Sequence, residues 1–200
     1  MKKSLTVGCV IMASGLSRRF GANKLLADFC GQPMLCRAFA ATATPGIAAR
    51  IVVTRSEDVQ ALCRTQGVPV LLHSLPGRND TVRLGLSALL EQLPELSGCM
   101  FLPGDQPLLR RESVGSLVDF YREHPEHIAA LGHDGVRGNP CLFPAQLFPE
   151  LLALQGDHGG NQVIRRHEED LLLWEVPAPE LTDVDTPQVL AQLRRDMAEE

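Results

Sequence analysis

The stretch "LTVGCVIMASGLSRRFGANKLL" (residues 5–26) joins a run of apolar residues to a loop with two glycines and several cations. The apolar run, residues 5–12, does not alternate with polar residues, which is typical of a strand buried on both faces of a parallel sheet. Ligands of such sheets bind beyond the carboxyl ends of the strands, where this loop begins. The stretch therefore predicts a buried parallel strand whose following loop contacts a ligand.

Short β-type runs alternate with helical patterns almost to the end of the chain. This alternation predicts a three-layer α/β/α architecture with a mostly parallel sheet. Two hundred residues with 44% hydrophobic content are expected to form one compact domain over residues 1–200. We expect strands at 5–12, 50–54, 69–72, 98–103, 127–131, 141–144 and 171–176, and helices at 33–43, 57–66, 81–93, 111–122, 145–154, 161–168 and 187–199.

The composition excludes several classes of protein. A net charge of −5 argues against general affinity for nucleic acid or for anionic membranes, and no segment approaches the roughly 20 apolar residues of a membrane span. The first residues imitate a secretion signal, but Gly8 interrupts the apolar run and Arg19 and Lys24 follow it, so we expect a cytoplasmic protein. The six cysteines show neither a C-x-x-C pair nor zinc-like spacing, and most are expected to be buried thiols in a reducing compartment.

The loop after the first strand has the features of an anion site. Gly15 and Gly21 can adopt positive φ and let the backbone approach a ligand, while Arg18, Arg19 and Lys24 add positive charge. The spacing matches neither the P-loop nor G-x-G-x-x-G. We interpret the loop as a site for a phosphate chain, and the alternative is a surface turn with solvated cations.

The motif "GDQP" (104–107) places Asp105 directly after an apolar strand, at the predicted ligand edge of the sheet. A single carboxylate suits Mg²⁺, which takes one or two protein carboxylates and fills its other positions with water and substrate phosphates. The alternative is that Asp105 only caps the following turn. With the cationic loop nearby, the metal interpretation is favoured.

Two further acidic residues, Asp183 and Asp185, lie in "TDVDTPQVL" (182–190), before the last predicted helix. In an extended segment two residues this far apart face the same way. One of them could complete the metal site, and Asp185 or Thr186 is expected to cap the helix, which has Pro187 in its first turn. We assign the metal role to Asp183 and the cap to Asp185 and Thr186.

The stretch "GRNDTVRLGL" (77–86) begins a predicted helix with hydroxyl and amide groups. A helix N-terminus of this kind can hold a base, a ribose or a phosphate, so Asn79 and Thr81 are candidate nucleotide-binding residues. The alternative, equally weighted, is that Asp80 only caps the helix.

Taken together, these motifs resemble those of the MobA/MocA-like nucleotidyltransferases, in order and over nearly the whole chain. The first loop, "MASGLSRRFGANKLL" (12–26), resembles L-A-A-G-x-S-x-R-M-G-x-x-K-L-L, and "TVRLGL" (81–86) resembles S-L-x-x-G-L. The stretches "GDQP", "GNPCLFP" (138–144), "GDHGG" (156–160) and "DVDTPQVL" (183–190) resemble G-D-x-P, G-x-P-x-L-F, G-D-x-G and D-I-D-T-P-x-D-L. Each motif alone is weak, but six in sequence are specific.

The resemblance implies a Rossmann-like nucleotidyltransferase fold and a Mg²⁺-dependent transfer of a nucleoside monophosphate from an NTP to the phosphate of molybdopterin, with release of pyrophosphate. With CTP, which Ser14 favours, the transferred group is CMP. A molybdoenzyme or its maturation chaperone is the implied protein partner. No protein nucleophile is needed, so His73, His133, His158 and His167 are expected to be surface or packing residues. The implied nucleotide and metal residues are Ala13, Ser14, Gly15, Arg19, Lys24 and Asp105, of which Arg19, Lys24 and Asp105 are catalytic; the implied acceptor residues are Gly138, Pro140, Gly156 and Asp157.

Departures from the family pattern leave alternatives open. Ser14 stands where the guanylyl-transferring branch tends to glycine and the cytidylyl branch to alanine, and its size favours CTP over GTP. Asn161 stands where arginine often follows the G-D-x-G motif, which leaves the acceptor open. The alternatives are a guanylyltransferase, a sugar-phosphate nucleotidyltransferase, or a non-catalytic adaptor of cofactor maturation that binds a nucleotide.

Overall fold

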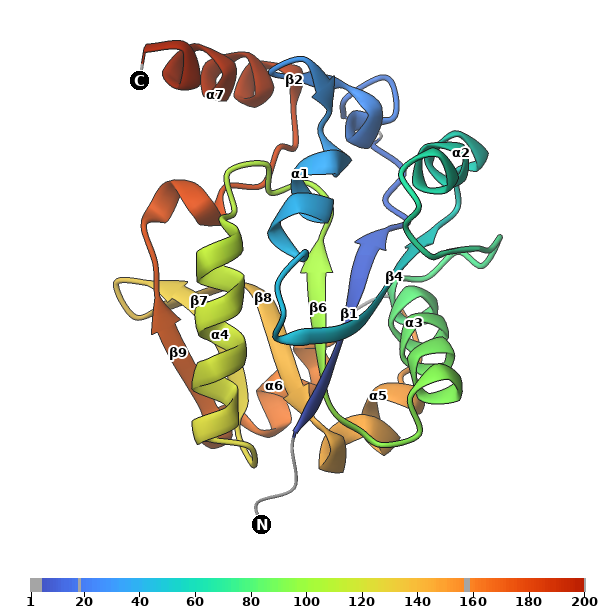
Figure 1. Cartoon of the computed structure of the whole chain (residues 1–200), viewed down its shortest axis with the longest axis vertical. Coiled ribbons are helices and arrows are strands. Elements are labelled where there is room, and N and C mark those ends of the chain that lie inside the picture. The colour runs from blue at the N-terminus through green and yellow to red at the C-terminus, as the bar shows by residue number, and fades with distance from the viewer. Residues whose placement is uncertain (1–4, 18, 157–158, 200) are drawn as a thin grey trace.

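The computed structural model describes residues 5–17, 19–156 and 159–199. Seven strands form one sheet in the order β5-β4-β1-β6-β8-β7-β9 (Figure 1). All neighbouring pairs are parallel except the two that involve β8, so the sheet is mostly parallel, as predicted. The strands are β1 (Thr6–Ala13), β4 (Ile47–Thr54), β5 (Val70–Leu72), β6 (Leu96–Pro103), β7 (Ile128–His133), β8 (Val136–Pro144) and β9 (Leu171–Glu175).

Helices cover both faces of the sheet, which confirms the predicted α/β/α layers. Alternate side chains of β1 explain the two layers, because Cys9 and Ile11 belong to one buried apolar cluster and Val10 to the other. The first cluster includes residues of α1 (Leu35–Ala41), α2 (Glu57–Thr65), α4 (Arg111–Glu123) and α7 (Pro187–Glu199). The second includes residues of α3 (Arg78–Gln92), α5 (Phe148–Leu152) and α6 (Asn161–Arg166).

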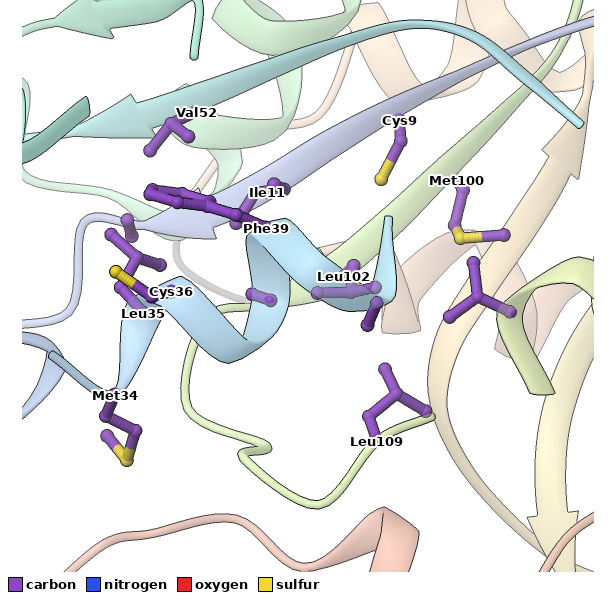
Figure 2. Packing of buried hydrophobic residues seen from close by; sticks show 14 of the residues in the cluster. Cys9, Ile11, Met34, Leu35, Cys36, Phe39, Val52, Met100, Leu102 and Leu109 are labelled. Carbon is purple, nitrogen blue, oxygen red and sulfur yellow. The ribbon is translucent and has the colours of Figure 1, made fainter. Parts of the chain in front are cut away.

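On the face of the sheet covered by α1, buried side chains of the helix pack against the central strands β1 and β4. Figure 2 shows Phe39 and Leu35 of α1 over Ile11 of β1 and Val52 of β4, all of them buried. Five of the six cysteines are buried, as predicted, whereas Cys30 is exposed. Burial raises the pKa of the Cys9 thiol to about 12, so this thiol stays protonated and unreactive near neutral pH.

On the second face, α3 lies unusually close to β1 because its central residue is Gly85. A Cβ atom at Gly85 would lie 2.5 Å from Cγ1 of Val10 and 3.1 Å from Cγ2 of Val53. The glycine of "TVRLGL" is therefore explained by packing between the helix and the sheet. This close approach also fixes the position of the N-terminus of α3, which lies at the ligand edge.

We expect Gly85→Ala to lower the free energy of unfolding by about 1–3 kcal/mol, because the added methyl group overlaps buried valine side chains. Urea denaturation of the two proteins measures the difference. The control is Gly115→Ala in α4, where an added Cβ would lie 3.4 Å from the side-chain oxygen of Thr44, an ordinary contact. Gly67→Ala is unsuitable as a control because Gly67 has a φ of +66°, which strains an alanine. Equal stability of Gly85→Ala and wild type would contradict the packing explanation.

Strand β8 is longer than predicted and runs against its neighbours. The sequence predicted residues 141–144, but the strand begins at Val136 because the polar stretch "VRGNP" pairs with β7. Phe101 of β6 pairs with Cys141 of β8, so the first residues of β8 lie beside the last residues of β6. Because β8 is antiparallel to its neighbours, its first residues, which include Gly138 and Pro140, lie at the edge of the sheet where the parallel strands end.

Other differences from the predicted elements are local. The helix predicted at 33–43 begins at Leu35, because residues 28–33 form a small hairpin of β2 (Asp28–Phe29) and β3 (Gln32–Pro33). The helix predicted at 145–154 is a 3₁₀ turn (Ala145–Leu147) followed by α5, which has Pro149 in its first turn. Further 3₁₀ turns lie at Lys24–Leu26, Glu168–Asp170 and Ala178–Leu181. Within the described residues, no helix has the length and apolar content that a membrane span needs.

Candidate active site

The candidate site lies at the carboxyl ends of β1, β4 and β6. The chain connects β1 to β4 on one side and places β6 on the other, which is the switch point where sheets of this type bind ligands. The loops that follow these strands carry most of the residues that the sequence analysis singled out. The structure therefore brings the first loop, "GDQP" and "TDVDTP" to one edge.

The first loop is held in a defined shape by its own backbone. Ser17 adopts a left-handed φ of +48°, its carbonyl accepts a hydrogen bond from Phe20 N at 2.9 Å, and its hydroxyl accepts one from Lys24 N at 3.2 Å. Gly21 has a φ of +76°, as predicted, but Gly15 does not adopt positive φ. A Cβ built on Gly15 would have no heavy atom of the described residues within 4 Å, so the space above this backbone is open to a ligand.

Four charged side chains from three segments meet beside this loop, and we call them the Lys24 cluster: Arg19, Lys24, Asp105 and Asp185. The Lys24 ammonium lies 2.5 Å from Oδ2 of Asp105 and 3.0 Å from Oδ1 of Asp185. Arg19 Nη2 lies 2.8 Å from Oδ2 of Asp185, in a more exposed pair. Arg18, the third predicted cation, lies outside the described residues. The predicted catalytic residues Arg19, Lys24 and Asp105 are thus brought together.

The ion pairs of this cluster shift the pKa values of its members. Burial on its own would lower the pKa of Lys24, but the negative charges of Asp105 and Asp185 outweigh burial and raise that pKa. A hydrogen bond from Lys24, followed by the charges of Lys24 and Arg19, lowers the pKa of Asp185. Both groups are therefore fully charged at neutral pH.

Asp183 lies next to this cluster in a segment that is tied to the "GDQP" loop. The neighbouring Val184 is buried, and its N–H donates to the backbone oxygen of Asp105 at 2.9 Å. Desolvation beside the "GDQP" loop, followed by the negative charge of Asp105, raises the pKa of the Asp183 carboxyl group. The influence of Asp105 on this pKa indicates that the two acidic side chains lie near each other.

The carboxylates of this site suit Mg²⁺ better than a metal ion whose ligands all come from the protein. In the described part of the chain, no group of three or more His, Cys, Asp or Glu side chains is arranged to hold a metal ion. Asp105 and Asp183, the predicted ligands, would supply two carboxylates, which is the usual protein share in a site completed by water and substrate phosphates. The residues present therefore fit the predicted cation.

The cap of the last helix belongs to Thr186. Its side-chain oxygen accepts a hydrogen bond from Val189 N at 3.3 Å. The assignment of Asp185 to this cap is wrong, because the Asp185 carboxylate is paired with Lys24 and Arg19 instead. Sequence spacing alone could not separate the two roles, since both residues precede the helix.

The "GDQP" loop is also joined to the C-terminal segment by Glu180, which the sequence analysis did not identify. This carboxylate is 3% exposed, and one of its oxygens accepts from Arg110 N at 3.0 Å. The Gln106 side chain donates to the backbone oxygen of Leu181 at 3.3 Å. Two acidic segments far apart in the sequence are thereby held together at the site.

At the start of α3, Asp80 takes the capping role. Gly77 N donates to Oδ2 of Asp80 at 2.9 Å, and Arg83 pairs with the other carboxylate oxygen. Asn79 and Thr81 are buried, and Oδ1 of Asn79 accepts from Gly159 N at 2.6 Å. The Asn79 amide nitrogen and the Thr81 hydroxyl have no hydrogen-bond partner in the described structure. Their nucleotide-binding role stays a prediction.

We expect Asp80→Ala to lower the free energy of unfolding by about 1 kcal/mol at pH 7, because the cap is lost. Hydrogen bonds from Arg83 and Gly77 N lower the pKa of Asp80, so its contribution is complete above the unfolded pKa of about 4 and is lost as pH falls through the folded value. Denaturation at pH 7 and near pH 3 should show the gap between the proteins closing. A gap of constant size would argue against the cap.

A cavity of about 500 Å³ adjoins the N-terminus of α3. It is lined from one side by Gly77, Asn79 and Arg83 and from the other by Gly156. A predicted nucleotide-binding residue and a predicted acceptor-binding residue therefore share one cavity. Asp157, the next predicted acceptor residue, lies outside the described residues.

Gly138 and Pro140, the other predicted acceptor residues, lie in the first half of β8. A Cβ on Gly138 would approach Cδ1 of Leu181 to 2.9 Å, so this glycine is needed for packing against the C-terminal segment. Nearby, Nη2 of Arg137 donates to Oδ1 of Asn161 at 3.0 Å, which links β8 to α6. The acceptor role of both residues stays a prediction.

Two residues near the first loop were missed from the sequence, Arg55 and His73. The Arg55 guanidinium donates to the backbone oxygen of Ser14 from Nε at 2.8 Å and from Nη2 at 2.6 Å. His73 Nε2 lies 2.8 Å from the Ser14 hydroxyl, so the expectation of a plain packing role was incomplete. A signal was present, because each residue directly follows a strand, as the predicted site residues do.

The sequence of the chain also matches a known protein family. A family model described as the MobA-like NTP transferase domain matches residues 9–171. The chain belongs to this family. The predicted resemblance is thereby confirmed, and the matched residues of the MobA-like chain include the first loop, "GDQP" and β8.

Two curated relatives show how far the similarity extends. The MobA-like chain is 33% identical over 113 residues to the 3-deoxy-manno-octulosonate cytidylyltransferase of Neisseria gonorrhoeae, which covers 56% of this chain and 44% of that protein. This chain therefore spans less than half of that relative's length. It is 26% identical to the purine catabolism protein PucB of Bacillus subtilis over 99% of this chain and 100% of PucB.

A solved structure with a similar fold is Rv0371c of Mycobacterium tuberculosis. It superposes on the MobA-like chain with a TM-score of 0.82 and 22% identity, over 96% of this chain and 99% of Rv0371c. A second structure of Rv0371c, in complex with manganese, has a TM-score of 0.75 and 21% identity, over 95% and 98% of the two chains. At this identity the likeness concerns the fold.

Proposed function

We propose that this MobA-like protein transfers CMP from CTP to the phosphate of a molybdopterin-type acceptor and releases pyrophosphate. The observation that carries the proposal is the Lys24 cluster, in which cations of the first loop and carboxylates of the "GDQP" and "TDVDTP" segments meet at the switch point of the sheet. A nucleoside triphosphate needs cations for its phosphates and carboxylates for its metal ion, and this edge supplies both.

In the proposed reaction, the chain's own residues bind and orient the phosphates. Lys24 and Arg19 would hold the β- and γ-phosphates and stabilise the departing pyrophosphate, while the backbone at Ser14 and Gly15 would contact the nucleoside. Asp105 and Asp183 would hold Mg²⁺, which when bound would neutralise charge on the phosphates. An acceptor phosphate oxygen forms the new bond to the α-phosphorus as the bond to the β-phosphate oxygen breaks, and pyrophosphate leaves with that electron pair.

Direct transfer without a covalent protein intermediate is consistent with the thiols of the structure. Burial raises the pKa of Cys36, Cys63 and Cys141, as it does for Cys9, so none of these is a ready nucleophile. The acceptor itself supplies the attacking oxygen. Proton transfer is a minor demand, because a phosphate acceptor is already ionised at neutral pH.

A second candidate acceptor is a sugar acid. The relative from Neisseria gonorrhoeae, 33% identical over its matched part, is a 3-deoxy-manno-octulosonate cytidylyltransferase. Asn161, which bonds to Arg137 beside β8, departs from the family pattern near the predicted acceptor residues. We keep molybdopterin as the first proposal because the family model that matches the chain is the MobA-like one.

The test is pyrophosphate release from CTP, GTP, ATP and UTP with Mg²⁺, in the presence of molybdopterin, of 3-deoxy-manno-octulosonate, or of neither acceptor. Release that requires molybdopterin and is fastest with CTP supports the proposal. Release that requires the sugar acid supports the second candidate. Release that is fastest with GTP would indicate a guanylyltransferase. Binding of a nucleotide with no release from any combination would support the non-catalytic adaptor instead.

A further inference from the structure

Ser14 in the first loop is held from outside the loop by three groups. Its hydroxyl donates to the backbone oxygen of Val53 at 3.1 Å, and its carbonyl receives two hydrogen bonds from Arg55. The same hydroxyl lies 2.8 Å from Nε2 of His73, in a hydrogen bond whose donor depends on the tautomer of the histidine. The polar groups of Ser14 are therefore largely used within the protein.

Arg55 connects two parts of the candidate site, the first loop and the start of α3. In addition to Ser14, its Nη1 donates to the backbone oxygen of Pro76 at 3.2 Å. Pro76 directly precedes Gly77, at the start of α3, and both residues line the 500 Å³ cavity. One guanidinium thus joins the first loop to a wall of the cavity.

The shape of the guanidinium group explains why an arginine stands here. Its donors lie in a fixed planar fork, so a single side chain can direct two N–H groups at one carbonyl and a third at another. Arg55 directly follows β4, whose last residue, Thr54, donates its hydroxyl to the backbone oxygen of Ala13 at 3.0 Å. The end of β4 therefore fixes consecutive carbonyls of the loop that begins at Ala13.

We propose that Arg55 is a positioning residue that ties the first loop to the start of α3 and thereby sets the affinity for the nucleotide. This inference rests on the proposed function, because it requires the nucleotide to bind between these two segments. Arg55 acts through the backbone of Ser14 and Pro76 rather than on the reacting groups. Its removal should weaken binding of the whole nucleotide and leave the chemical step nearly unchanged.

Three variants test this role. Arg55→Ala removes all three hydrogen bonds, and Arg55→Lys keeps the charge but replaces the planar fork by one ammonium group. The matched control is Arg50→Ala, in β4 but away from the site, where the guanidinium bonds to the Phe39 carbonyl at 2.5 Å and to the Thr42 hydroxyl at 3.0 Å. Each variant is compared with wild type in its dissociation constants for CTP and CMP, its kcat and KM, and its stability.

We expect Arg55→Ala to raise the dissociation constants of CTP and CMP by the same factor, about 10- to 100-fold, and to change kcat by less than about threefold. Arg55→Lys should recover part of the affinity, and Arg50→Ala should lower stability without changing affinity. A much larger loss for CTP than for CMP would show that Arg55 contacts the terminal phosphates directly. Unchanged affinity in Arg55→Ala would show a purely structural role. Either result overturns the proposal.

Hydrogen exchange in the nucleotide-free protein separates this inference from the proposed function. Arg55→Ala should speed exchange of the backbone amides in residues 14–17 and 74–77 together, whereas Arg50→Ala should not. Unchanged exchange in these segments would show that Arg55 does not hold the first loop to the start of α3, whatever the protein binds. If Arg55→Ala speeds exchange in both segments but the wild-type protein binds no nucleotide, the proposed function and the predicted effect on affinity are both wrong. The link that Arg55 makes between the two segments is then still confirmed.

Discussion

Asp105→Asn is expected to lower turnover by about 10³-fold and to leave the fold intact. The amide has no charge with which to hold a divalent cation, and the neutralisation of phosphate charge by a metal ion is worth several kcal/mol in the transition state. The fold should survive because the segment at Val184 is held by the backbone oxygen of Asp105 and not by its side chain. Steady-state kinetics with Mg²⁺ and CTP, together with thermal unfolding, measure both effects.

The matched control for this prediction is Asp119→Asn. Asp119 is an exposed aspartate of α4 whose carboxylate pairs with Arg122 at 3.0 Å. Loss of this surface ion pair should change neither turnover nor stability by a measurable amount. Asp105→Asn should also abolish the binding of Mn²⁺ in the presence of CTP. Full activity in Asp105→Asn would remove this residue from the metal site.

The second large effect is expected from Lys24→Met, which should lower turnover but tighten the binding of Mn²⁺ to the nucleotide-free protein. Turnover should fall by about 10²- to 10³-fold, because a preorganised cation for the triphosphate is lost. In the absence of nucleotide, Mn²⁺ should bind at least about tenfold more tightly, because the ammonium group that lies 2.5 Å from Asp105 no longer neutralises the carboxylates. Steady-state kinetics measure the turnover, and calorimetric titration with Mn²⁺ in the absence of CTP measures the metal affinity.

Arg194→Met is the control for the loss of an ion pair between distant parts of the chain. Arg194 of α7 pairs with Asp28 of β2 at 2.9 Å, in an exposed position. This change should alter neither metal affinity nor turnover. Weaker binding of Mn²⁺ to nucleotide-free Lys24→Met would mean that Lys24 supports the metal site rather than competing for its carboxylates.

Much of the fold could be predicted from the sequence because the sheet is buried on both faces. The run at residues 5–12 is continuously apolar, and the structure places its strand at Thr6–Ala13 in the centre of the sheet. The first half of β8 was missed because "VRGNP" is polar and contains a proline, and its pairing with β7 is a long-range effect that local patterns do not encode. The two-residue strands β2 and β3 are too short to give a pattern.

The site was predicted where a chemical group directly follows a strand in a recognisable motif. Lys24, Asp105 and the 183–185 segment do meet, although the ion pair of Asp185 with Lys24 could not be seen from spacing. Arg55 was missed because it belongs to no motif, even though it also directly follows a strand. Its role depends on the backbone oxygens of Ser14 and Pro76, and no sequence motif marks which distant backbone oxygens a side chain will contact.

The order of synthesis gives the ion pair between Lys24 and Asp185 a further consequence. These residues are separated by 161 positions in the chain, and the carboxylate comes from the segment just before the last helix. While the chain is still emerging from the ribosome, the central strands can pair before this segment exists. In a nascent chain, Lys24 of the first loop can therefore pair with Asp105 but not yet with Asp185. The full arrangement of charges at the proposed nucleotide site forms only after residue 185 has been synthesised.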